Sequence, residues 1–161
     1  MYTTGDVLKF LLRALGGRAP YTSLVHLAFL AQYDVRSREA RKYLAGGEPL
    51  ARAEFHLQEG VSSYEVADAA EELPNSFDGV YMELVYDGPA PTLPPPVERR
   101  LAYVAVEYGG WKPWQLRRHI HEVLDLTIPE KQSDYAGLSV DKYFWAEGFT
   151  LKTKELLTGI Y

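Results

Sequence analysis

Apolar and polar positions follow a helical period over the first part of the chain. Within residues 7–15 apolar side chains recur at positions i, i+3, i+4, i+7 and i+8, and two glycines follow, so the spacing predicts a helix over residues 4–16. A second helix, capped by Thr22 or Ser23 and running to Tyr33, is apolar around nearly its whole circumference. Such a helix is expected at the centre of a domain.

The period then changes from helical to alternating. A third helix is expected to begin at Asp34 or Ser37 and to end at the glycines 46–47. Residues 53–58 alternate strictly between apolar and polar side chains, which is typical of a strand with one buried face. A second strand is expected within residues 79–86, and we expect the two strands to form a small sheet.

Between these two expected strands lies a short acidic helix. Ser62 and Glu65 have the spacing of a capping box, in which each side chain bonds to the other residue's backbone amide. The pattern predicts a helix over residues 64–72 that stops at Pro74.

The second half of the chain follows a proline-rich segment. Residues 89–96 include five prolines and predict a stiff, extended connector. Helices are expected from Val97 to Tyr108 and from Pro113 onward. Beyond these, Ser139 and Thr150 could each cap a short terminal helix.

Together these elements predict the fold class. We expect one α+β domain over residues 1–161, predominantly helical, with a small antiparallel sheet of two or three strands. The connector at 89–96 would divide it into a half of helices and strands, residues 1–88, and a helical half, residues 97–161.

Charge is segregated along the sequence. Residues 53–98 contain ten acidic side chains and no lysine or arginine, whereas both flanking segments are basic or balanced. The net charge is −5. Such segregation predicts one cationic and one anionic face, a surface suited to docking with charged macromolecules.

Composition excludes several classes of chemistry. The chain has no cysteine, so disulfides, Cys-type zinc sites and thiolate catalysis are excluded. It also lacks the nucleophile-elbow pattern and the glycine-rich phosphate-binding spacings. We therefore expect no catalytic residue, no cofactor and no enzymatic activity.

The histidines do not form a metal-ligand pattern. His119 and His121 are about 200° apart around a regular helix, so they cannot grip one ion. His121 and Asp125 do share a face, but no further ligand cluster accompanies them, and we expect no metal. His26, on the apolar second helix, is expected to be a partly buried imidazole with its hydrogen bonds satisfied.

Composition also bears on the environment of the protein. No apolar stretch is long enough to span a bilayer and no signal-peptide pattern is visible, so we expect no membrane partner and a cytoplasmic location. The absence of cysteine and the single asparagine, Asn75, are typical of a thermophilic source.

Two kinds of macromolecular partner remain. The first is a protein, because tryptophan dominates interface hot spots and an acidic surface can pair with a basic one. The candidate partner-binding residues are the acids Glu65, Asp68, Glu71 and Glu72 and the tryptophans Trp111, Trp114 and Trp145.

The alternative partner is DNA. Three helices followed by strands have the order of a winged-helix domain, whose third helix enters the major groove. The residues that would contact DNA are Arg36, Arg38, Arg41 and Lys42. The net charge of −5, the isoelectric point near 5.4 and the acids that follow disfavour this alternative.

Three short motifs resemble those of the Panacea domain family, which includes SocA-like antitoxins and phage-associated proteins. They are the apolar helix ending in Leu27-Ala28-Phe29-Leu30-Ala31-Gln32-Tyr33, the segment from Phe55 to Val66 with Gly60 before two serines, and Tyr108-Gly109-Gly110-Trp111 leading to His119. The likeness spans roughly residues 22–125, although Gly60-Val61 lacks the family's usual proline.

The resemblance implies a compact, mostly helical domain without enzymatic activity. It also implies that the domain binds and neutralises a toxin or delivers it to a protease. An acidic surface on such a protein could mask a basic, nucleic-acid-directed partner, in agreement with the charge pattern.

Overall fold

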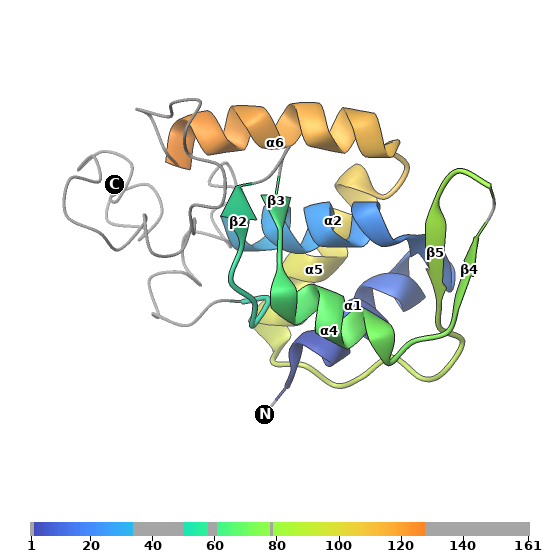
Figure 1. Ribbon diagram of the computed structural model, residues 1–161. Helices are drawn as coiled ribbons and strands as arrows, with labels where there is room; N and C mark the ends of the chain where they lie inside the picture. The colour runs from blue at the N-terminus through green and yellow to red at the C-terminus, as the bar shows by residue number, and fades with distance from the viewer. Residues whose placement is uncertain (1, 34–49, 58–60, 78, 128–161) are drawn as a thin grey trace.

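The computed structural model describes residues 2–33, 50–57, 61–77 and 79–127. The elements in these ranges, in chain order, are α1 (Thr4–Ala14), β1 (Arg18–Pro20), α2 (Tyr21–Tyr33), β2 (His56–Leu57), β3 (Val61–Ser62), α4 (Tyr64–Glu71), β4 (Asn75–Phe77), β5 (Met82–Val85), α5 (Pro95–Tyr108) and α6 (Pro113–Thr127). This arrangement confirms the predicted α+β class, with helices predominating and a small antiparallel sheet (Figure 1).

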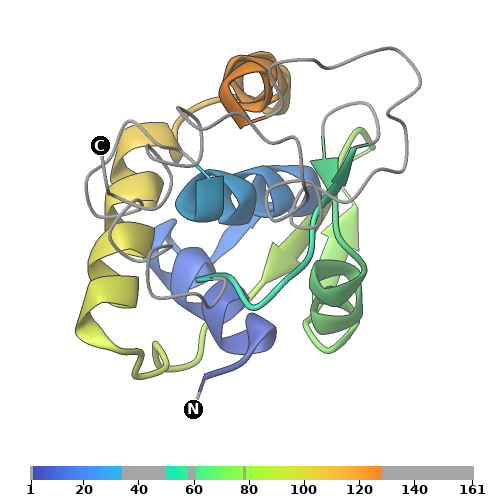
Figure 2. The ribbon, with the colours of Figure 1, turned by 90° about the vertical axis from the view of Figure 1, so that its left-hand side faces the viewer.

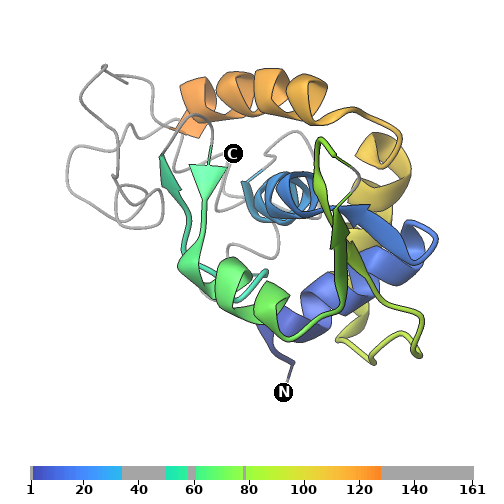
Figure 3. The ribbon, with the colours of Figure 1, turned by 45° about the vertical axis from the view of Figure 1, so that its right-hand side comes forward.

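Helix α2 lies at the centre of the molecule. Every residue from Ser23 to Tyr33 is buried, as the apolar circumference of this segment predicted. Helices α1, α5 and α6 all contact α2, and the views from different sides place α2 between α6 and α4 (Figures 1, 2 and 3). The other elements therefore form a shell around one helix.

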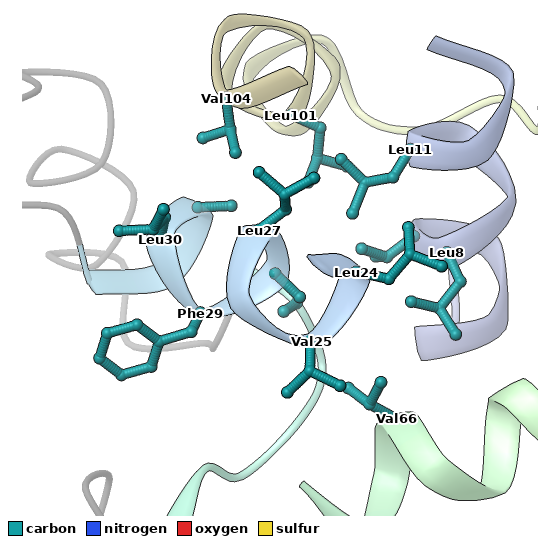
Figure 4. Packing of buried hydrophobic residues seen from close by; sticks show 14 of the residues in the cluster. Leu8, Leu11, Leu24, Val25, Leu27, Phe29, Leu30, Val66, Leu101 and Val104 are labelled. Atoms are coloured by element: carbon teal, nitrogen blue, oxygen red, sulfur yellow. The ribbon is translucent and has the colours of Figure 1, made fainter. Parts of the chain in front are cut away.

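The core consists of aliphatic side chains from this shell directed at α2. Figure 4 shows Leu24 of α2 beside Leu8 of α1, and Val25 beside Val66 of α4. On the α5 side, Leu27 lies near Leu101. Because α2 is apolar on all faces, it binds each surrounding helix through a different face.

An aromatic cluster closes the C-terminal end of α2. The rings of Phe29 and Tyr33 lie 5.2 Å apart, and Phe55 meets Phe29 edge-on at 5.5 Å. Phe55 comes from the segment predicted as the first strand, and two residues of its apolar phase, Ala53 and Phe55, are buried as expected. The cluster fixes residues 50–57 against the central helix.

A buried arginine holds α5 to the end of α2. Arg100 is 1% exposed, and its Nη2 and Nε donate to the carbonyl oxygens of Leu30 and Ala31 at 2.8 and 3.2 Å. These carbonyls belong to the last turn of α2, where helix carbonyls lack amide partners and the helix dipole favours a cation. The contact gives both carbonyls a donor and places the guanidinium where the helix dipole favours a cation.

The main sheet differs from the expected one. Strand β1 was missed, and it pairs antiparallel with β5, which also pairs antiparallel with β4 (Figure 3). The expected pairing of residues 53–58 with 79–86 is wrong, because β2, within the first segment, pairs with β3 in a separate two-stranded sheet. Arg18 spans the main sheet, contacting Glu83 of β5 and the Ser76 hydroxyl of β4.

The N-cap of helix α4 lies one residue later than expected. Ser63, not Ser62, is the N-cap, and its hydroxyl accepts a hydrogen bond from the Val66 amide at 3.3 Å. Ser62 instead belongs to β3, opposite His56. The Glu65 carboxylate accepts from the Glu54 amide at 2.8 Å, so it ties α4 to the preceding segment rather than closing a capping box.

Helix α5 begins inside the proline run. The predicted connector 89–96 is too long by two residues, because α5 starts at Pro95 with Pro94 as its N-cap. Proline is well suited to the first turn, where its missing amide has no helical partner. The Glu98 carboxylate folds back and accepts from the Leu93 amide at 3.1 Å, which stabilises this start.

The turn from α5 to α6 requires a residue without a Cβ. A Cβ placed on Gly109 would collide with the Ala105 carbonyl and lie 2.6 Å from the Leu15 side chain. Gly109 itself has ordinary right-handed helical torsions, so the requirement comes from close packing rather than from a left-handed cap. The turn is thereby packed tightly against the end of α1.

The remaining expectations concern other residues. The predicted helix after Asp34 and the caps at Ser139 and Thr150 fall outside the described residues. The division of one domain at the proline segment stays a prediction. None of the helices in the described ranges has both the length and the hydrophobicity needed to cross a bilayer.

The first testable prediction concerns Arg100. We expect Arg100→Gln to lower the free energy of unfolding by about 2–4 kcal/mol, because it leaves buried helix-end carbonyls without donors. The matched control is Arg99→Gln, at the exposed neighbouring position, which should change stability by less than about 0.5 kcal/mol. Urea unfolding of the three proteins measures both values, and equal losses for the two variants would contradict the proposed role.

Candidate functional site

The acidic candidates lie on α4 but have different environments. Asp68, Glu71 and Glu72 are exposed at the outer face and C-terminal end of the helix. Glu65 is only partly exposed, and its carboxylate is engaged by the Glu54 amide. Three of the four predicted acids are therefore available to a partner, and the fourth has a structural contact.

A β-hairpin beside α4 exposes apolar side chains that the sequence analysis did not select. Phe77 of β4 is 70% exposed and Val80 of the connecting turn is 72% exposed. Met82 of β5, opposite Phe77 in the antiparallel register, is also exposed, as is Tyr81. The sequence did contain a signal for this surface, namely apolar residues at three successive positions, 80, 81 and 82. Successive side chains of a strand point to opposite faces, so at least one of them faces solvent when only one face of the sheet is covered.

The hairpin rises directly from the end of α4. Leu73 and Pro74 connect the two elements, and the Val85 amide of β5 donates to the Pro74 carbonyl at 2.9 Å. Figures 1 and 3 show the hairpin extending away from the C-terminal end of α4, with its turn at the end farther from the helix. We call this region the hairpin–α4 surface; its residues are Asp68, Glu71, Glu72, Phe77, Val80, Tyr81 and Met82.

The aromatic candidates gather at the α5–α6 turn. The Trp111 ring meets Tyr108 edge-on at 4.9 Å and His119 edge-on at 5.5 Å, and the rings of Tyr108 and His119 lie 5.1 Å apart. Tyr108 and His119 are buried. His119, considered above only as a metal ligand, thus belongs to a packed aromatic cluster.

A shallow, open pocket of about 250 Å³ lies over this cluster. Its lining residues are Trp111, Trp114, Gln115, Arg118 and His119. We call it the Trp111–Trp114 pocket. The structure therefore brings two of the three predicted tryptophans into one site, and Trp145 lies outside the described residues.

The two candidate regions do not form one surface. Helix α4 lies on one side of α2 and helix α6 on the other in all three ribbon views (Figures 1, 2 and 3). The acidic and the aromatic candidates, predicted together as one set of partner-binding residues, are thus two separate sites.

Two further predictions concerned DNA contact and metal binding. Arg36, Arg38, Arg41 and Lys42, predicted for DNA contact, lie outside the described residues. Within the described ranges, no three histidine, cysteine or acidic side chains gather in a metal-binding arrangement.

His26 is a buried titratable group whose pKa is shifted by the fold. Its Nδ1 lies 2.6 Å from the Thr22 carbonyl, and since a carbonyl only accepts, Nδ1 carries the proton. Nε2 is buried without a hydrogen-bond partner. Burial lowers the pKa of His26; the bond to Thr22 opposes the shift, and the charges of Arg117 and His121 on α6 add to it. The imidazole is thus buried, as expected, but only half satisfied.

Comparison with protein-family models, with curated proteins and with solved structures finds no match to this chain. The resemblance to the Panacea domain family therefore stays a prediction.

The second testable prediction follows from His26. Because its pKa in the folded protein lies below the unfolded value of about 6.5, the unfolded chain binds protons more readily, and stability falls as the pH drops below that value. The contribution of one group is at most about 1.4 kcal/mol per pH unit. We expect His26→Leu to flatten the dependence of unfolding free energy on pH between about 6.5 and 4.5.

The control for this measurement is His121→Gln, which removes an exposed imidazole from the facing helix. It should retain most of the pH dependence, since burial is the larger cause of the His26 shift. An unchanged pH profile in His26→Leu would show that other groups determine the acid sensitivity.

Proposed function

We propose that this chain is a non-enzymatic protein-interaction module that binds and masks a basic protein partner through the hairpin–α4 surface. The observation that carries the proposal is a hairpin with exposed apolar side chains that follows directly after the exposed acids of α4. Exposed apolar side chains concentrated on one small protrusion are typical of interaction sites.

Each part of this surface has a distinct role in binding. Phe77 and Val80 would supply the apolar area that partner contact removes from water. Asp68, Glu71 and Glu72 would form the charged rim, which steers a basic partner and selects against acidic ones. An anionic membrane or a nucleic acid would be repelled by the same carboxylates.

The order of elements supports this interpretation. The connectivity α1–β1–α2–α4–β4–β5, with β5 between the other two strands, resembles that of winged-helix domains with an additional segment inserted before α4. In DNA-binding members of that class the helix at the position of α4 enters the major groove. Here that helix is acidic, so the same arrangement is suited to a basic protein surface.

The resemblance to SocA-like antitoxins points to the same class of function. An antitoxin of this kind acts by occupying a partner, and a basic, nucleic-acid-directed toxin would complement the acids of α4. The DNA-binding alternative through Arg38 and Arg41 stays a prediction, and the experiment below includes it.

The third testable prediction uses charge reversal and hairpin truncation. The partner is identified by mass spectrometry of what co-purifies from the native cells, and association is then followed by surface plasmon resonance. We expect Glu71→Lys with Glu72→Lys to slow association about tenfold at low salt, because rim charges act on the encounter rate. Phe77→Ser with Val80→Ser should speed dissociation by at least about tenfold, because apolar anchors act on the bound complex.

Matched controls exist on α5. Glu107→Lys reverses an exposed acid there, and Val106→Ser removes an apolar side chain that is 86% exposed, both outside the hairpin–α4 surface. Neither should change the rates. The proposal fails if the hairpin and control variants bind alike. Salt-sensitive, sub-micromolar binding to duplex DNA that is lost in Arg38→Ala and Arg41→Ala would favour the alternative.

A further inference from the structure

We propose that the Trp111–Trp114 pocket is a second binding site, for a small planar anion. The ligand class is a single aromatic ring system that carries a carboxylate or a phosphate group. The site lies at the α5–α6 turn, across α2 from the acidic helix, and is independent of the hairpin–α4 surface.

The polar atoms around the pocket are mainly hydrogen-bond donors. An indole nitrogen and a guanidinium can only donate, which applies to Trp111, Trp114 and Arg118. The amide oxygen of Gln115 already accepts a hydrogen bond from the Lys112 amide at 2.8 Å. The side-chain nitrogen, a donor, is therefore the group of Gln115 that a ligand would meet. No acidic residue lines the pocket. A ligand rich in acceptors, such as an anion, matches this set.

The walls of the pocket favour a flat, apolar ring. Trp111 is held edge-on against two buried rings, Tyr108 and His119, so its orientation is set before a ligand arrives. Trp114, in the first turn of α6, is 58% exposed, although an indole is among the side chains most stabilised by burial. A ring stacked on Trp114 would cover that surface.

The size of the pocket and the charge of its lining further restrict the class of ligand. A volume of about 250 Å³ is below the range of pockets for drug-sized ligands, which begin near 300 Å³. One ring system with its anionic group is of a size to fill such a pocket. Arg118 gives the planar, two-donor recognition that carboxylates and phosphates share.

The fourth testable prediction is binding of model anions by the full chain. The probes are adenosine 5′-monophosphate and indole-3-carboxylate, titrated by isothermal calorimetry with tryptophan fluorescence as a second readout. We expect at least one to bind with a dissociation constant below about 1 mM. Adenosine, inorganic phosphate and acetate should each bind at least about tenfold more weakly, because they lack either the charge or the ring.

Variants locate the binding. Arg118→Gln and Trp114→Leu should each weaken it at least about tenfold, and Arg118→Lys, which keeps the charge without the planar fork, should lie in between. Arg99→Gln, an exposed arginine on α5 outside the pocket, is the matched control and should bind as the unchanged protein does. The inference is overturned if neither anion binds at millimolar concentration, or if the pocket variants and the control bind equally.

Discussion

The fold depends on one constraint, which is that a helix buried on every side needs the elements around it to supply hydrogen-bond partners for most of its polar groups. Helix α2 supplies apolar faces to its neighbours, and hydrophobic burial drives their assembly around it. Its few polar groups then fix how the neighbours dock. The Gln32 amide oxygen accepts from the Ala51 amide at 3.1 Å, and Arg100 donates to the last carbonyls of the helix. An unsatisfied polar group at these depths would cost more than one hydrogen bond contributes, so each contact selects one arrangement.

The sequence predicted those parts of the fold that depend on local periodicity. The buried character of α2, the start of α6 at Pro113 and the class of the fold all follow from the spacing of apolar residues. Pairing of strands was not predictable in the same way. Strand β1 has three residues, too few to show an alternation, and its partner β5 lies more than sixty positions later. The choice of Ser63 over Ser62 as the cap likewise depends on β3, which recruits Ser62 into a sheet.

The sequence predicted which types of residue form the candidate sites, but not where those residues lie in the fold. Charge segregation identified the acids of α4, and aromatic content identified Trp111 and Trp114. The separation of the two groups by α2 depends on how the chain wraps, which no local pattern reports. Arg100 was missed because an arginine on an amphipathic helix normally faces water. It is buried here only because it meets carbonyls from a helix that lies far away in the sequence.

The Arg100 contact also bears on how the chain reaches its native state. Its hydrogen bonds join residues 69 and 70 positions apart, so they close a long loop and cannot form early from local contacts. During synthesis the apolar helix α2 leaves the ribosome well before α5 is available to cover it and to donate hydrogen bonds to its C-terminal carbonyls. Nascent chains of this protein therefore pass through a stage at which the hydrophobic surface of α2 is exposed. At that stage chaperone binding and aggregation compete with folding.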